Sequence, residues 1–151
     1  MGHFKNIAES FYREVRRVEI YKAEDISYID TFNGVFPDTE QIVVSFDIVP
    51  EGYDRGIRPK TQNGNYFTDI NISFSLLDMS LDTVDKCNQY FNKKEFAIVL
   101  YSNIEKMLLG NDREKLKIEI IDNRKEDNSG NDEYTIAISG DTIIKPQTKY
   151  I

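Results

Sequence analysis

Residues 66–77, YFTDINISFSLL, alternate apolar and polar side chains more regularly than any other part of the chain. Successive side chains of a β-strand point to opposite faces, so this pattern predicts one long strand with a buried and a solvated face. A shift of one residue in its pairing would expose the whole apolar set, and this fixes its register. The polar face carries Asp69, Asn71, Ser73 and Ser75, and the apolar face carries Tyr66, Thr68, Ile70, Ile72, Phe74 and Leu76.

Five further segments favour strands. Residues 15–22 alternate after an ambiguous stretch that is read as a short helix or arm, and residues 96–101 are apolar on both alternating faces. The latter pattern predicts a central strand that is covered on both sides. Two last strands are predicted around residues 116–120 and 134–138, joined by a polar link with its tip at residues 128–131. Residues 41–49 form the remaining strand, with one face made of Ile42, Val44, Phe46 and Ile48.

One helix is predicted over residues 80–94. Ser80 can cap its start, and Asp82 and Asp85 lie near that start, where the helix dipole favours anions. Two basic residues are predicted to close the helix, and five side chains form its inward stripe. The closing residues are Lys93 and Lys94, and the stripe comprises Leu81, Val84, Cys87, Asn88 and Phe91.

The other segments are interpreted as a helical turn and two arms. Residues 104–109 are predicted as a helical turn that ends at Gly110. Arms are expected at residues 1–14 and at residues 141–151, which contain Pro146. Six predicted strands and one helix therefore indicate a mainly β (α+β) single domain over residues 1–151. Its expected architecture is an antiparallel β-sandwich or a partly open barrel with one flanking helix.

A long loop is predicted between the two clearest strands, at residues 50–65. Three glycines and two prolines argue against a helix or strand persisting through it, and loops of this length are often functional. It carries three basic residues against two acidic ones, in a chain whose net charge is −7. We therefore expect it to contact an acidic surface of a neighbouring subunit, although a solvated loop without that role stays open. The candidate contact residues are Tyr53, Arg55, Arg58, Lys60 and, from the C-terminal arm, Tyr150.

Composition argues against several classes of protein. The chain has 19 Lys and Arg residues and 26 Asp and Glu residues. A protein that binds duplex nucleic acid usually has a clustered excess of basic residues, so this balance argues against that class. The single cysteine excludes an internal disulfide framework and a multi-cysteine zinc site. No apolar run approaches the roughly 18 residues that a membrane helix needs, and the N-terminus lacks the apolar core of a signal peptide. We expect no membrane contact.

The residues with chemical potential all have a simpler structural interpretation. His3 lies near the chain end, Cys87 falls on the inward face of the predicted helix, and Asp82 and Asp85 suit a helix start. Residues 127–133 resemble a calcium loop only faintly, because they lack its ligand spacing. We therefore predict no catalytic, cofactor or metal site and no enzyme activity. An enzyme with an unrecognised site stays an alternative.

The order of elements is similar to that of tail-tube and tail-terminator proteins of tailed bacteriophages. Four stretches carry this resemblance, residues 42–50, 66–78, 80–94 and 96–101, and the Asn-, Lys- and Ile-rich composition resembles the ring and neck proteins of crAss-like phages. The resemblance implies a sandwich or barrel with a flanking helix that assembles into hexameric or dodecameric rings. It also implies that long hairpin loops and terminal arms reach neighbouring subunits.

The expected function follows from this resemblance. The protein would be a structural virion subunit of the tail or head–tail region, made in the bacterial host cytoplasm and assembled into a ring around the DNA conduit. Its partners would be copies of itself and neighbouring virion tail or neck proteins. An acidic subunit suits DNA that passes through without specific binding. The alternative is a β-sandwich binding module that recognises a carbohydrate or small ligand through the loop at residues 50–65.

Overall fold

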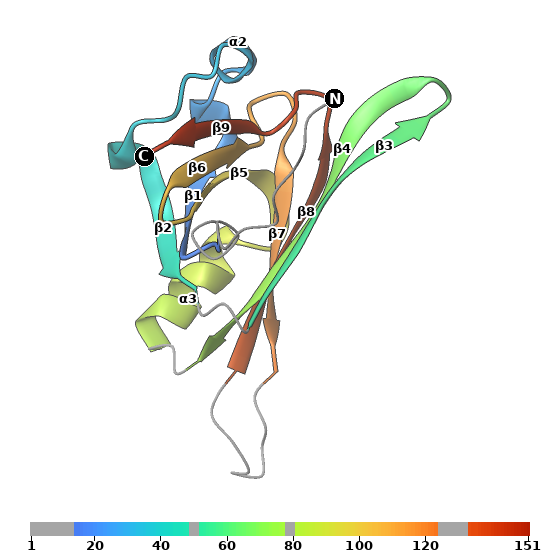
Figure 1. The fold of residues 1–151 in the computed structure, drawn as a ribbon. Coiled ribbons are helices and arrows are strands. Elements are labelled where there is room, and N and C mark those ends of the chain that lie inside the picture. Colours follow the sequence, from blue (N-terminus) through green and yellow to red (C-terminus); the bar gives the residue numbers. More distant parts are fainter. Residues whose placement is uncertain (1–13, 49–51, 78–80, 124–132) are drawn as a thin grey trace.

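A computed structural model describes residues 14–48, 52–77, 81–123 and 133–151 of the chain. These residues form one antiparallel sheet that curls into a half-barrel, with one main helix packed against it (Figure 1), which confirms the mainly β, α+β prediction. The strands are β1 (Arg17–Lys22), β2 (Ile42–Asp47), β3 (Tyr53–Gln62), β4 (Asn65–Leu77), β5 (Lys93–Tyr101), β6 (Glu105–Leu109), β7 (Leu116–Asp122), β8 (Glu133–Thr142) and β9 (Gln147–Tyr150). The helices are α2 (Tyr28–Phe32), α3 (Leu81–Tyr90) and the 3₁₀ helices η1 (Ala23–Asp25) and η2 (Thr39–Gln41).

The sheet branches at β5. Its main path runs β2-β1-β5-β7-β8-β4-β3, and β6 with β9 forms a side branch. The first part of β5, from Lys93 to Phe96, pairs with β7, whereas its last part, from Ile98 to Tyr101, pairs with β6. In Figure 1, β6 and β9 run across the upper part of the view while β7, β8 and β4 run down it. The predicted central strand is confirmed, because β5 has partners along both edges and is buried on both faces.

The main core lies on the face of the sheet that α3 covers. Val84, Cys87 and Phe91 of the predicted stripe are buried there, whereas Asn88 is exposed and does not belong to the stripe. The rings of Phe91 and Phe96 meet edge to face with their centroids 5.5 Å apart. Burial raises the pKa of the Cys87 thiol to about 11, as expected for a cysteine that acts as a small hydrophobe.

The predicted faces of β4 are confirmed with one exception. Ile70 and Ile72 are fully buried, and Thr68, Phe74 and Leu76 of the same face are also buried. Tyr66, however, is 79% exposed. The pairing of β4 with β8 ends at Thr68 and Thr142, so Tyr66 lies beyond the last supporting residue of β8.

The predicted helix over residues 80–94 is too long at its C-terminal end. Asn92 adopts a positive φ of 68°, and Lys93 and Lys94 begin β5 instead of closing the helix. Asn92 is held in place by β7, because its amide donates to the Ile118 carbonyl at 2.6 Å and its side-chain oxygen accepts from the Ile120 amide at 3.1 Å. Ser80, the expected cap, lies outside the described residues.

The helical turn predicted at residues 104–109 is wrong, because β6 occupies this segment. Short apolar runs do not distinguish a helix from a strand by themselves, and here pairing with the buried strand β5 decides. Ser102 forms the tight turn that allows this pairing. Its Oγ accepts hydrogen bonds from the Ile104 and Glu105 amides at 3.3 and 3.0 Å.

The C-terminal arm expected at residues 141–151 is instead part of the sheet. Its first residues complete β8, and β9 pairs with β6 from Gln147 to Tyr150. Thr142 and Ile144 are buried, so the segment also contributes packing. Two other predictions are confirmed. β1 ends at Lys22, and the last two predicted strands, β7 and β8, pair with each other. His3, residues 1–13 of the N-terminal arm and the link tip at residues 128–131 lie outside the described residues.

The segment from residue 23 to residue 41, for which the sequence showed no clear pattern, covers the second face of β1, β5 and β6. A smaller apolar cluster lies beneath it, built around Tyr21, Ile26, Val99 and Leu108. Within this segment, the Ser27 Oγ caps α2 by accepting from the Asp30 amide at 3.0 Å. We call residues 23–41 the α2 segment.

Candidate subunit interface

The segment predicted as a long loop is a β-hairpin, so that prediction is wrong. Residues 53–62 form β3, and Asn63 and Gly64 make the turn to β4 with positive φ angles of 53° and 80°. An Asn-Gly pair with these angles is typical of a two-residue type I′ turn. Pro59 is compatible with β3 because the strand lies at the edge of the sheet, where one side needs no backbone partner.

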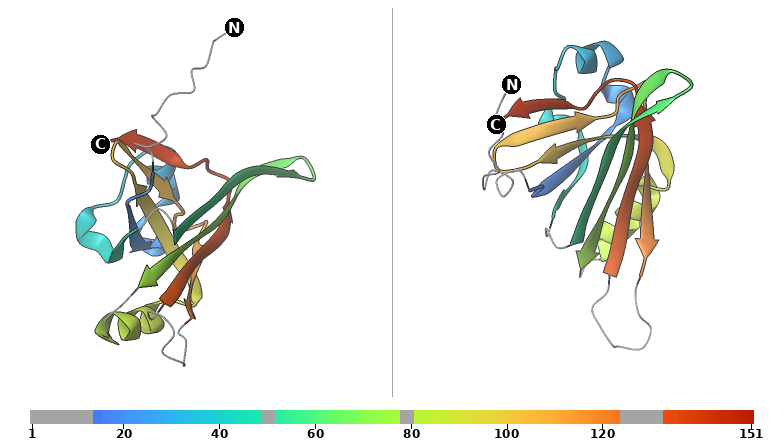
Figure 2. Two further views of the ribbon diagram at one scale, coloured as in Figure 1. Left: turned by 60° about the horizontal axis from the view of Figure 1, so that its bottom comes forward. Right: turned by 45° about the vertical axis from the view of Figure 1, so that its right-hand side comes forward.

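The hairpin extends beyond the rest of the sheet. β3 and β4 pair up to Gln62 and Asn65, whereas β4 has no partner in β8 beyond Thr68. Residues 59–67 therefore form a two-stranded projection, which Figure 2 shows in light green reaching past the body of the half-barrel. A two-stranded hairpin is marginally stable in water by itself. This projection is the least supported part of the described sheet.

Two of the predicted contact residues, Tyr53 and Arg55, lie on the core-facing side of β3. Tyr53 packs against the main core, its hydroxyl has no hydrogen-bond partner among the described residues, and burial raises its pKa to about 12. Arg55 donates from Nη2 to the Met107 Sδ at 3.4 Å, which links β3 to β6 across the half-barrel. Tyr53 therefore contributes to the core of a single chain, whereas Arg55 is exposed and contacts β6 through this hydrogen bond.

The other predicted contact residues lie elsewhere on the surface. Arg58 and Lys60 are exposed on the opposite side of β3, and Lys60 forms a 2.9 Å ion pair with Asp69. This hydrogen bond from Lys60 holds the pKa of the Asp69 carboxyl below its usual value. Tyr150 is 72% exposed at the end of β9. Of the five candidates, Tyr53 thus packs against the core, and the other four are exposed.

A groove lies between the projecting hairpin and the connection from β8 to β9. It has a volume of about 940 Å³. We call it the hairpin groove. Its walls come from the hairpin (Ile57, Pro59, Lys60, Thr61, Tyr66, Phe67 and Thr68) and from the connection (Ile143, Lys145 and Pro146). Ile143 is 72% exposed, so an apolar side chain stands open on each wall. The charged residues among the described lining are both lysines, and none is acidic.

Glu114 fixes the wall that the connection contributes. Its carboxylate oxygens accept hydrogen bonds from the backbone amides of Ile143 and Ile144. The Thr142 hydroxyl donates to the Ile144 carbonyl at 3.0 Å and holds the same segment from the other side. The groove is therefore bounded by a wall that is anchored in the sheet and by a hairpin that is not. No local sequence pattern indicates the groove, because it brings together residues about 80 positions apart.

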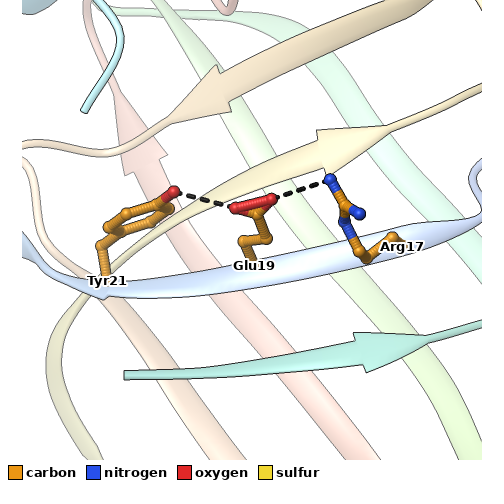
Figure 3. Close-up of polar contacts among 3 residues, drawn as sticks. All are labelled: Arg17, Glu19 and Tyr21. Carbon is orange, nitrogen blue, oxygen red and sulfur yellow. Dashed lines mark hydrogen bonds and ion pairs between the residues drawn. The ribbon is translucent and has the colours of Figure 1, made fainter. Parts of the chain in front are cut away.

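A cluster of titratable side chains, Arg17, Glu19 and Tyr21, lies elsewhere, on β1 (Figure 3). Glu19 is 2% exposed and accepts hydrogen bonds from the Tyr21 hydroxyl at 2.9 Å and from the Arg17 guanidinium at 3.0 Å. The Arg17 guanidinium also stacks on the Tyr101 ring, 4.2 Å from its centroid. Burial, assisted by the nearby Glu19 carboxylate, raises the pKa of both tyrosine hydroxyls.

The contacts of this cluster fit a structural role. The buried carboxylate is partnered on both oxygens, as a charge inside a protein requires. In the sequence, Glu19 and Tyr21 alternate with Val18 and Ile20, and this pattern gives no sign that the Glu19 side is buried. The smaller apolar cluster beneath the α2 segment includes Tyr21, which lies on the same side of β1.

Comparisons with known proteins give no relative. Neither the family models, nor the curated proteins, nor the solved structures include a match to this chain. Among the described residues, no group of three or more His, Cys, Asp or Glu side chains is placed to hold a metal ion. In that same part of the chain, no helix has the length and apolar character needed to cross a membrane. The function must be inferred from the geometry of the chain itself.

Proposed function

We propose that this protein is a structural subunit that assembles with copies of itself, as ring proteins of the tail or head–tail region of tailed bacteriophages do. The observation that carries the proposal is the projecting hairpin at residues 59–67, which continues past the last β8 residue and holds Tyr66 79% exposed. An isolated hairpin gains stability when another surface packs against it. A neighbouring subunit provides that surface.

The chain offers the distinct surfaces that a ring needs. A closed ring uses two different patches on each subunit, so that one copy contacts the next in a head-to-tail manner. β2 and β3 end the main path of the sheet at opposite sides, and β9 ends the side branch. Exposed strand edges of this kind can pair with another chain. The hairpin and these edges together support assembly into a larger structure.

The proposed location is the virion, in the tail or the neck, with neighbouring tail or neck proteins as further partners. The support for this step is the resemblance in element order together with the curled antiparallel sheet and its flanking helix. The net charge of −7 favours a conduit that DNA passes through without specific binding, because like charges weaken phosphate contacts.

Light scattering after size-exclusion chromatography, together with negative-stain images, tests this proposal. Over a series of protein concentrations, we expect the mass to rise to a fixed multiple of the monomer mass and the images to show rings. A protein that stays monomeric at every concentration, alone and with partner virion proteins, would contradict the proposal.

One observation favours a second function, a binding module for a carbohydrate or small ligand. The hairpin groove, at about 940 Å³, falls within the size range of small-molecule sites and has largely apolar walls. This function predicts a stable monomer whose melting temperature rises when a ligand is added. A concentration-dependent mass without any ligand-dependent shift would favour the subunit function instead.

A further inference from the structure

We propose that the hairpin groove of one copy binds the α2 segment of a second copy. This inference rests on the proposed subunit function and deepens it, because it names the two surfaces that meet.

The α2 segment is strongly acidic. Residues 23–41 contain five acidic residues and no basic one, and all five acidic side chains are exposed: Glu24, Asp25, Asp30, Asp38 and Glu40. The same segment exposes three apolar side chains. Ile29 is 66% exposed, Phe32 is 70% exposed and Val35 is 51% exposed. The surface therefore combines exposed apolar side chains with negative charge.

The hairpin groove has the complementary character. Tyr66 and Ile143 expose apolar surface on its two walls, and its charged lining residues are Lys60 and Lys145. Lys60 is already paired with Asp69, which leaves Lys145 as the better placed cation for an incoming carboxylate. Apolar contact supplies most of the affinity at such an interface, and opposite charges set the orientation and the rate of encounter.

Exposed apolar side chains are concentrated on these two surfaces. In the described part of the chain, five of the eight large apolar residues that stand exposed belong either to the α2 segment or to the groove. Large exposed apolar patches on a protein commonly mark places where it contacts another molecule. Among the described residues nothing covers the exposed side chains of either surface, and the two surfaces carry opposite charges.

The contact must form between copies rather than within one. In Figure 1 the α2 helix and the tip of the β3–β4 hairpin stand as separate projections of the molecule. Because the two patches differ, each copy can bind one neighbour through its groove and another through its α2 segment. This is the heterologous geometry that closes into a ring when the rotation between copies allows it.

Charge reversal tests the pairing. We expect Lys145→Glu and Asp30→Lys each to weaken association by up to about tenfold, and the double variant to recover much of that loss. The matched control is Lys149→Glu, which makes the same charge change on β9 outside the groove. Phe32→Ser should weaken association more, by about thirtyfold, because it removes a central apolar anchor. The measurement is the dissociation constant from sedimentation equilibrium, beside a thermal melt that confirms folding.

Directed disulfide formation tests which residues meet. Two variants, Phe32→Cys and Ile143→Cys, are mixed under mild oxidation, with Phe32→Cys and Ile121→Cys as the control pair because Ile121 is exposed outside the groove. The native Cys87 is 2% exposed and should not react. We expect the first mixture to form a covalent heterodimer several times faster than the control.

The outcomes separate this inference from the proposed function. One outcome is that the wild-type protein assembles, the charge variants and Phe32→Ser associate as tightly as the wild type, and the two cysteine mixtures crosslink at the same rate. The interface is then elsewhere, so the inference is overturned while the subunit function stands. If the wild-type protein stays monomeric and the groove takes up a small ligand or a different protein, both are overturned. Rescue by the double charge variant, together with selective crosslinking, supports both.

Discussion

Two parts of the same strand, β4, differ in what covers them. From Thr68 to Phe74 the strand lies between β3 and β8, whereas from Asn65 to Phe67 it pairs with β3 alone. Ile70 and Tyr66 belong to the same face of the strand, yet Ile70 is fully buried and Tyr66 is 79% exposed. The alternation of the sequence thus determines which side chains share a face. The third strand determines whether that face is buried.

The largest expected loss of stability comes from a charge placed in the part of β4 that lies between β3 and β8. Ile72 is fully buried in the main core, so Ile72→Asp places an unpaired carboxylate there and should cost about 4 kcal/mol or more, enough to unfold the domain. Circular dichroism and a thermal melt measure the result. The control is Asn71→Asp, because Asn71 is the neighbouring residue of β4 and is exposed. This change should leave the melting temperature unchanged. A folded Ile72→Asp variant would contradict the assignment of this face.

Two glycines of the hairpin sharpen the comparison. A Cβ atom at Gly56 would lie 2.4 Å from the Asn71 carbonyl oxygen, so Gly56→Ala forces the two strands apart and should destabilise the protein by about 1–3 kcal/mol. A Cβ atom at Gly64 would meet no atom within 4 Å, and the cost there comes only from its φ of +80°.

Because the tip lies outside the supported sheet, Gly64→Ala should change global stability by less than about 1 kcal/mol. It should instead loosen residues 59–67 locally. Chemical denaturation gives the global free energy of unfolding, and hydrogen exchange gives the local one. Equal global losses for Gly56→Ala and Gly64→Ala would show that the tip folds as one unit with the core.

Two tyrosines with opposite hydroxyl environments give a smaller contrast. The Tyr53 hydroxyl is buried without a partner among the described residues, so Tyr53→Phe should leave stability unchanged or raise it by up to about 1 kcal/mol. The Tyr21 hydroxyl donates to the buried Glu19, so Tyr21→Phe should lower stability by about 1–2 kcal/mol. Urea titration of both variants measures the difference. A clear loss for Tyr53→Phe would mean that its hydroxyl has a partner that the described residues do not include.

The smallest expected effect is a pH dependence at the hairpin. Lys60 holds the pKa of Asp69 below its ordinary value of 3.8, so the folded state favours the charged carboxylate. This contribution to stability is present at neutral pH, and it is lost as the pH falls below 3.8 through the lower folded-state value. Asp69→Asn should remove that part of the acid dependence. Melting curves between pH 2 and pH 6 that coincide in shape for both proteins would show that the exposed pair adds no stability.

The sequence predicted the elements whose pattern is local and missed those that depend on distant partners. β4, β5, β7 and β8 were found because their apolar residues repeat every second position or fill a short run. The glycines, prolines and charges of β3 hid a strand whose turn, Asn63-Gly64, is itself a strong hairpin signal. β6 and β9 depend on pairing with each other and with β5, which no local pattern reveals.

The candidate interface was predictable only in part. The length and basic character of residues 50–65 drew attention to the segment that forms most of the hairpin, but not to the faces on which its residues lie. Tyr53 packs against the core and the exposed Arg55 lies on the same side of β3, whereas Arg58 and Lys60 lie on the outer side. The groove itself needs the β8–β9 connection beside the hairpin, and the burial of Glu19 needs the α2 segment over β1. Both are products of the tertiary fold.

Hydrogen exchange at two protein concentrations tests most directly the claim that the projecting hairpin is completed by a neighbouring subunit. The measurement compares the backbone amides of residues 59–67, of which Pro59 has none, with those of residues 68–76 in dilute protein and in concentrated protein. We predict that residues 68–76 are protected equally in both, and that protection of residues 59–67 rises at high concentration together with the mass measured by light scattering. Equal protection of residues 59–67 in both samples, while the mass increases, would show that assembly leaves the hairpin uncovered and would contradict the claim.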